Sequence, residues 1–140
     1  MHNDAQIREQ VSRKLLQSGI NPTRQRVDIG LCLFARDMHI SADQLLEQVN
    51  SAPNEVSKAT VYNTLGLFAE KGLVREVVVN PGKVVYDTNT SNHHHIYNID
   101  TGHLKDIHSH DIQLTKLPDL ADGEQIDSVD IIVRVRNTRS

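Results

Sequence analysis

The sequence contains a single cysteine, Cys32, among its 140 residues. One cysteine excludes an intramolecular disulfide, and it also excludes a structural zinc site made of four cysteines. Cys32 lies between the apolar residues Leu31 and Leu33. We therefore expect it to be a buried apolar side chain rather than a reactive thiol.

Long apolar runs are also missing. No segment approaches the roughly 20 apolar residues of a membrane span, and the first residues have no apolar core like that of a signal peptide. Hydrophobic residues make up 38% of the chain and charged residues 24%, which is typical of globular proteins. We expect a cytoplasmic protein that does not bind membranes.

The chain has no excess of positive charge, because its formal net charge is -3. This value argues against a protein that coats nucleic acid in bulk, but it hides an asymmetry. Residues 1–86 carry ten Lys/Arg and nine Asp/Glu, whereas residues 87–140 carry five and nine. The distribution fits DNA contact in the first part and cation binding in the second.

The sequence pattern of residues 1–86 predicts four helices followed by a hairpin. Apolar spacing predicts helices over residues 5–18 and about 22–34, a third that begins at Ser41, and a fourth over about 57–71. Asn21 or Thr23 caps the second helix, and Ser41 with Gln44 forms a capping box. Residues rich in β-branched side chains on either side of a turn at residues 80–82 predict two strands, 73–79 and 83–87. This order of elements is that of a winged helix-turn-helix.

Seven side chains of this part are candidates for DNA contact. Arg24 and Arg26 fall in the first turn of a helix, where the helix dipole disfavours cations, so an external phosphate is the better explanation and solvated surface charges are the alternative. Recognition helices present small hydrogen-bonding residues, cations and aromatics to the major groove. The fourth helix presents Ser57, Lys58, Thr60, Tyr62 and Asn63. An ordinary amphipathic helix is the alternative here.

Residues 87–110 hold six of the eight histidines, with aspartates among them. They predict two strands, 93–99 and 103–108, on either side of a turn at 100–102. Alternation along a strand places His93 and His95 on one face and His94 on the other. Paired imidazoles with nearby carboxylates are metal ligands, and the alternative is a polar loop that happens to be rich in histidine.

The domain organisation follows from these patterns. We expect an α+β protein with a winged helix-turn-helix domain at 1–86, a hinge at 87–91 and a small α/β domain for dimerisation and metal sensing at 92–140. Pro118 limits any helix after residue 111 to a short one, and apolar alternation predicts a closing strand over 127–136. About 50 residues form a marginal core alone, so pairing with a twin subunit would supply the missing burial.

Together these segments resemble the ferric uptake regulator (Fur) family of bacterial metal-responsive transcription factors. The resemblance covers nearly the whole chain in order, through residues 22–26, 39–45, 57–62, 70–74, 82–87 and 93–95. It implies a homodimer that binds double-stranded operator DNA and is not an enzyme. Residues 60–65, the triple histidine and the lack of paired cysteines look most like the iron response regulator (Irr) branch. The peroxide regulator (PerR) branch is the near competitor.

The resemblance also implies a regulatory metal site made of His39, Asp87, His93, His95 and Asp106. Aspartates at both carboxylate positions resemble the peroxide-sensing members. The ion expected is Fe2+ or Mn2+, which Zn2+ can replace in crystals. A metal bound by both domains would fix the angle between them, and with it the spacing of two recognition helices on DNA.

The chain departs from the family in three places. The CxxC pairs are missing, so no structural zinc is expected, and Asn63 stands where the family usually has arginine. A second metal site is reduced to His94, joined by His108 and His110 if the strand that contains residue 106 runs that far. In the Irr branch the triple histidine is also implicated in haem binding, so this run is a candidate haem ligand set. A metal-dependent hydrolase and a passive metal or haem store are the rival functions.

Overall fold

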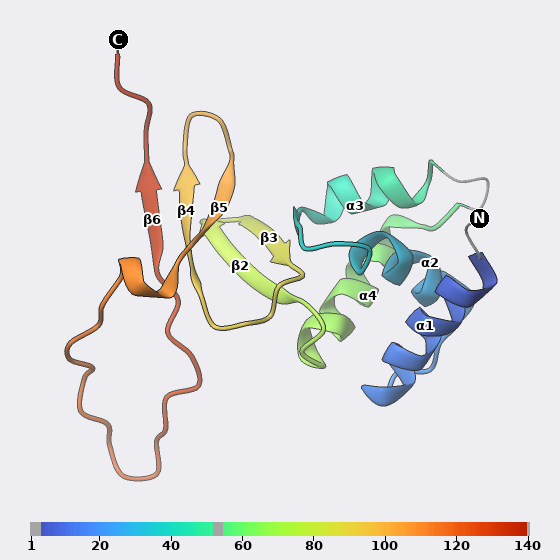
Figure 1. Cartoon of the computed structure of the whole chain (residues 1–140), viewed down its shortest axis with the longest axis horizontal. Coiled ribbons are helices and arrows are strands. Elements are labelled where there is room, and N and C mark those ends of the chain that lie inside the picture. Colours follow the sequence, from blue (N-terminus) through green and yellow to red (C-terminus); the bar gives the residue numbers. More distant parts are fainter. Residues whose placement is uncertain (1–3, 52–54, 140) are drawn as a thin grey trace. The chain divides into compact units, whose positions relative to one another are not determined.

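A computed structural model describes residues 4–51 and 55–139, and the chain forms two compact units, Met1–Thr90 and Ser91–Ser140. The first unit contains α1 (Asp4–Gln17), α2 (Arg24–Leu33), β1 (His39–Ile40), α3 (Ala42–Val49), α4 (Lys58–Glu70), β2 (Arg75–Asn80) and β3 (Lys83–Asp87). The second contains β4 (His94–Asn98), β5 (Leu104–Ile107), the short 3-10 helix η1 (Ser109–Asp111) and β6 (Ile132–Val135) (Figure 1). The predicted α+β class is confirmed.

Three of the helices are capped at their N-termini by side-chain hydroxyls. Thr23 caps α2, Ser41 caps α3 and Ser57 caps α4, each by accepting a backbone N–H from the first turn. The side chain of Gln44 accepts the backbone N–H of Ser41 in return, so the predicted capping box is confirmed. Of the two predicted caps for α2, Thr23 is the correct one. Each cap stabilises its helix by about 1 kcal/mol.

One apolar core joins the four helices of the first unit. Every helix contributes at least one fully buried side chain, and the largest are Leu15, Leu33, Leu45, Leu65 and Phe68. The ring of Phe34 stacks on that of Phe68 at a centroid distance of 5.7 Å. The apolar side of α4 packs into this core. This packing fixes the orientation of the helix, so its opposite face points to solvent.

The wing is a three-stranded sheet with the order β1-β3-β2. The hairpin β2–β3 closes through Gly82, whose φ of +74° lies in the left-handed region that favours glycine. Sequence patterns do not predict β1, which pairs with β3 so that His39 lies opposite Asp87. The predicted strand 83–87 is confirmed as β3, and the side chain of Asp87, its last residue, is buried.

The second unit is a three-stranded sheet with the order β5-β4-β6. The predicted hairpin β4–β5 is confirmed, and β6 runs parallel to β4 with His95 opposite Ile132. The segment 112–131 has no helix or strand, so not even the short helix that Pro118 would allow forms there (Figure 1). Its apolar side chains are 43–50% exposed at Leu114, Leu117 and Leu120, and they gain too little packing to support a helix. Within the described ranges, no helix has the length and apolar character needed to cross a bilayer.

Candidate functional site

The first unit holds a histidine–carboxylate pair at the edge of its sheet. The pairing of β1 with β3 places His39 Nε2 at 3.1 Å from Asp87 Oδ2. The other oxygen of Asp87 accepts the backbone N–H of Asn89 at 2.9 Å. The hydroxyl of Thr88 holds β1 in place, because it accepts the N–H of Met38 at 2.9 Å. The Asp87 side chain is 1% exposed, and a carboxylate so buried needs a cationic partner.

The second unit holds two histidines and a carboxylate on one face of its sheet. His95 on β4 lies opposite Asp106 on β5. The Nε2 atoms of His93 and His95 lie 3.2 Å and 3.4 Å from the same oxygen of Asp106, Oδ1. The two imidazole rings are 4.6 Å apart between centroids. The predicted sharing of one strand face by His93 and His95 thus agrees with their common partner.

The hydrogen bond on the far side of His93 determines which tautomer its neutral ring adopts. Nδ1 of His93 lies 2.6 Å from the carbonyl oxygen of Ser91, which can only accept, so Nδ1 is the donor. In the neutral ring Nε2 then carries the lone pair, and it faces a carboxylate oxygen that also carries lone pairs. A divalent cation between the two groups would accept both sets of lone pairs. Histidines that bind metals commonly donate their other ring N–H to a backbone carbonyl, as Nδ1 of His93 does here.

The three remaining candidate histidines are arranged differently. His94 Nδ1 accepts the backbone N–H of Ile131 at 3.1 Å, which ties β4 to the residue before β6. The strand β5 ends at Ile107, so the shared face expected for residues 106, 108 and 110 does not exist. His108 and His110 instead flank the start of η1, and their rings stack at 5.5 Å. Their contribution to a second metal or haem site stays a prediction.

The outward face of α4 carries the predicted DNA-contacting residues. Tyr62 is 43% exposed, and its hydroxyl donates to Asp43 Oδ1 at 3.2 Å. Lys58 Nζ lies 5.7 Å from the centre of the Tyr62 ring. The hydroxyl of Ser57 donates to Thr60 Oγ1 at 2.9 Å, so its hydrogen is already used within the cap. Ser57 has to break this bond before it can donate to a phosphate.

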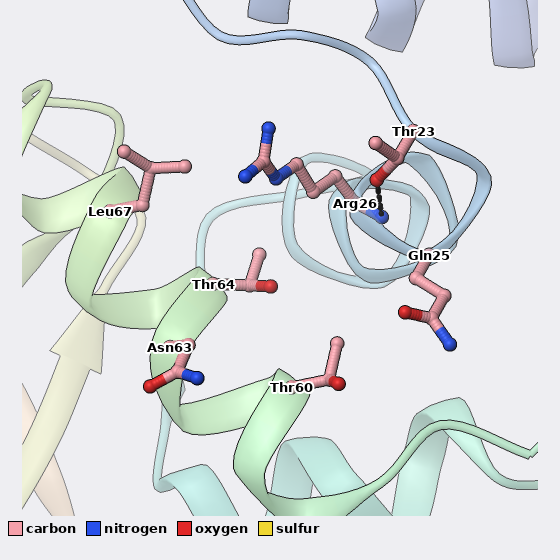
Figure 2. Close-up of a pocket in the computed structure, with 7 residues that line it drawn as sticks. All are labelled: Thr23, Gln25, Arg26, Thr60, Asn63, Thr64 and Leu67. Carbon is pink, nitrogen blue, oxygen red and sulfur yellow. Dashed lines mark hydrogen bonds between the residues drawn. The ribbon is translucent and has the colours of Figure 1, made fainter.

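Two pockets lie on either side of this face. One, of about 320 Å³, is bounded by α2 and α4 and is lined by Thr23, Gln25, Arg26, Thr60, Asn63, Thr64 and Leu67 (Figure 2). The other, of about 360 Å³, lies near the wing and includes Tyr62 and Tyr86. Burial, with nearby Glu76, raises the pKa of Tyr86, so this residue stays neutral at physiological pH. Arg24 is exposed and does not line either pocket.

Sequence reasoning missed two residues of this surface, Gln25 and Asp43. Gln25 lies in the first turn of α2 together with the two predicted arginines, so its position can be read from the sequence. Charge, which singles out the arginines, does not single out Gln25 because an amide is neutral. The partnership of Asp43 with Tyr62 joins α3 to α4 and has no sequence signal. Cys32 is partly buried against the core, and its pKa is raised by burial and by nearby Asp28. It therefore remains a protonated thiol at neutral pH, as expected of a packing residue.

The sequence model of the ferric uptake regulator family matches residues 17–134. The chain belongs to this family. Among the similar Fur-family proteins is the peroxide-responsive repressor PerR of Staphylococcus epidermidis, which is 30% identical over 105 residues. That match covers 75% of this chain and 69% of the relative. The Irr branch, which the sequence motifs favour, stays a prediction.

Two solved Fur structures share the fold. The ferric uptake regulator of Pseudomonas aeruginosa with manganese is 24% identical, covers 91% of this chain and 98% of its own, and has a TM-score of 0.71. The ferric uptake regulator of Francisella tularensis with iron is 19% identical, covers 82% and 89%, and has a TM-score of 0.65. At these identities the likeness shows the fold, and it confirms the predicted winged-helix unit followed by a small second unit.

Proposed function

We propose that this Fur-family chain is a metal-responsive transcription regulator that binds operator DNA as a homodimer. The observation that carries the proposal is the convergence of histidine Nε2 atoms on carboxylate oxygens in both units. His39 meets Asp87 in the first unit, and His93 with His95 meets Asp106 in the second. Each group offers the lone pairs that a divalent cation binds.

We propose that one ion binds all five residues. Asp87 ends β3 and His93 precedes β4, so the chain between them limits their separation to roughly 20 Å or less. An ion shared by the two units would fix the angle between them. In a dimer this angle sets the spacing of the two recognition helices along DNA, so the ion shifts the population toward one DNA-binding geometry.

The donor set, three imidazole nitrogens and two carboxylates, suits Fe2+, Mn2+ or Zn2+. We propose Fe2+ or Mn2+ as the working ion, in keeping with the solved relatives described with manganese and with iron. Haem bound by His93, His94 and His95 is a further signal suggested by the Irr resemblance. It would compete with the bonds that His93 and His94 make to the backbone.

A PerR-type peroxide sensor is the second candidate function. The Staphylococcus epidermidis relative is a peroxide-responsive repressor, and both carboxylates proposed for this site are aspartates. Mass spectrometry of the iron-loaded protein after peroxide treatment separates the two candidates. An added oxygen atom on His39, His93 or His95 supports peroxide sensing, and unmodified histidines support metal sensing alone.

Adding metal should change operator affinity by roughly 5- to 150-fold, because coupling free energies between sites are commonly about 1–3 kcal/mol. The operator is first selected from random DNA with Mn2+-loaded protein. Binding is then measured by fluorescence anisotropy with Mn2+ and with a chelator. Equal affinity in the two conditions would contradict a regulatory metal. A steady-state hydrolase assay with added metal tests the rival enzyme.

Removing the two outward side chains of α4 should have different effects. Tyr62→Ala should weaken binding to the operator about tenfold and binding to random DNA little, because the ring reads bases in this proposal. Lys58→Ala should weaken binding to both DNAs and lower the salt slope by about one. The control is Lys14→Ala, which removes a cation from α1, where Lys14 Nζ lies above the ring of Phe34. If neither variant differs from Lys14→Ala, α4 is not the recognition helix.

A further inference from the structure

The inference concerns the pocket that α2 and α4 share, and it rests on the proposed function because it names what α4 reads. The two exposed flanks of α4 differ in chemistry. On one flank Tyr62 is already bonded to Asp43. On the other flank Thr60, Asn63 and Thr64 line the pocket together with Gln25 of α2. Figure 2 shows Gln25 extending from α2, and the side chains of Thr60 and Thr64 extending from α4 into the space between the two helices.

The pocket is polar and nearly neutral. No carboxylate lines it, and its one cation, Arg26, is held by a bond from Nη1 to the backbone oxygen of Asn21 at 3.0 Å. Thr23 is also engaged, since its hydroxyl accepts a backbone N–H as the cap of α2. Among the lining side chains only the amides of Gln25 and Asn63 carry a donor and an acceptor on separate atoms, as a two-point contact requires, whereas a threonine hydroxyl carries both on one oxygen.

An amide matches one kind of partner especially well. A phosphate oxygen only accepts hydrogen bonds, so it uses just the NH2 half of an amide. The major-groove edge of adenine offers an acceptor, N7, and a donor, the N6 amino group, and a single Asn or Gln can bind both. Guanine presents two acceptors there, which suit arginine instead. The chemistry of this pocket therefore favours a base edge over the phosphate backbone.

We propose that Gln25 and Asn63 form a subsite that reads an A·T pair in the major groove. Asn63 supplies the amide from the recognition helix, and Gln25 supplies a second amide from the start of α2. Thr60 lines the same pocket and carries a methyl group, the kind of group that packs against the methyl of thymine. Gln25 is thereby a specificity-determining residue on a helix that otherwise contributes arginines.

The test uses the full chain loaded with Mn2+ and DNA selected from a random library. The wild type should prefer adenine at one position of each half-site. Gln25→Ala and Asn63→Ala should each lose that preference, with roughly tenfold weaker binding to the selected operator and less than twofold on random DNA. Asn63→Arg should change the preferred base at this position to guanine. Gln10→Ala, an exposed glutamine on α1, should match the wild type.

The results separate this proposal from the proposed function. If the wild type selects no common sequence, both are wrong. If the wild type selects an operator and both alanine variants keep the same base preference, only the subsite is wrong. Equal weakening on operator and random DNA, with a lower salt slope, would show that the pocket binds phosphate, and it would overturn the proposal. Circular dichroism checks that each variant keeps its helices.

Discussion

His95→Ala should lower Mn2+ affinity at least 100-fold and abolish the metal dependence of operator binding. His95 is 2% exposed and lies on the central strand of its sheet, where its Nε2 faces Asp106. Loss of outer-shell partners alone commonly costs about 10–100-fold in metal affinity, and loss of a ligand should cost more. Isothermal titration with Mn2+ and anisotropy on the selected operator measure the two effects. His103→Ala, an exposed histidine of the same unit, is the matched control.

A second variant tests whether one ion binds both units. His39→Ala removes a ligand from the first unit only. If a single ion binds all five residues, each single variant should lose the one bound Mn2+, and the double variant should lose little more. Two independent sites would instead leave half of the bound metal in each single variant. That outcome would contradict a shared ion and leave two local sites. Unchanged titration in His95→Ala would contradict the site altogether.

Phe68→Ala should lower the free energy of unfolding of the first unit by about 3–5 kcal/mol. Phe68 is fully buried, it stacks on Phe34, and it lies on the inner face of α4. The cavity left by the ring is surrounded by residues from other helices, which relax only in part. Urea unfolding followed by helical circular dichroism measures the change, because nearly all helical signal comes from this unit.

The control is Leu16→Ala, since Leu16 on α1 is 61% exposed. Its effect should stay within about 0.5 kcal/mol. A loss below about 1 kcal/mol for Phe68→Ala would show that the packing against α4 is loose. The outward face of α4 would then not be held rigidly enough to present its side chains to DNA bases with a fixed geometry.

The parts of the fold that sequence predicts well are those with local causes. The capping box of Ser41 and Gln44 and the turn at Gly82 each depend only on residues a few positions apart. Both predictions are confirmed. The predicted alternation of residues 93–95 also suffices to place His93, just before β4, and His95, on β4, with a common carboxylate. In these cases a short segment carries all of the physical information.

The features missed depend on partners distant in the chain. The strand β1 is two residues long and forms only because β3 pairs with it. The segment after residue 111 forms no helix, because Leu114, Leu117 and Leu120 stay largely exposed and gain little packing. Gln25 and Asp43 gain their roles by proximity to α4 through space. Periodicity cannot supply such information.

The parallel pairing of β6 with β4 has a consequence for the order of folding. It joins His95 to Ile132, 37 positions later in the chain. The first unit, Met1–Thr90, is the helical unit, and all of its segments precede residue 91. As the chain leaves the ribosome, the helical unit can fold before β6 has been synthesised. The sheet that carries His93 and His95 is therefore completed last, after the four helices and the wing have had time to fold.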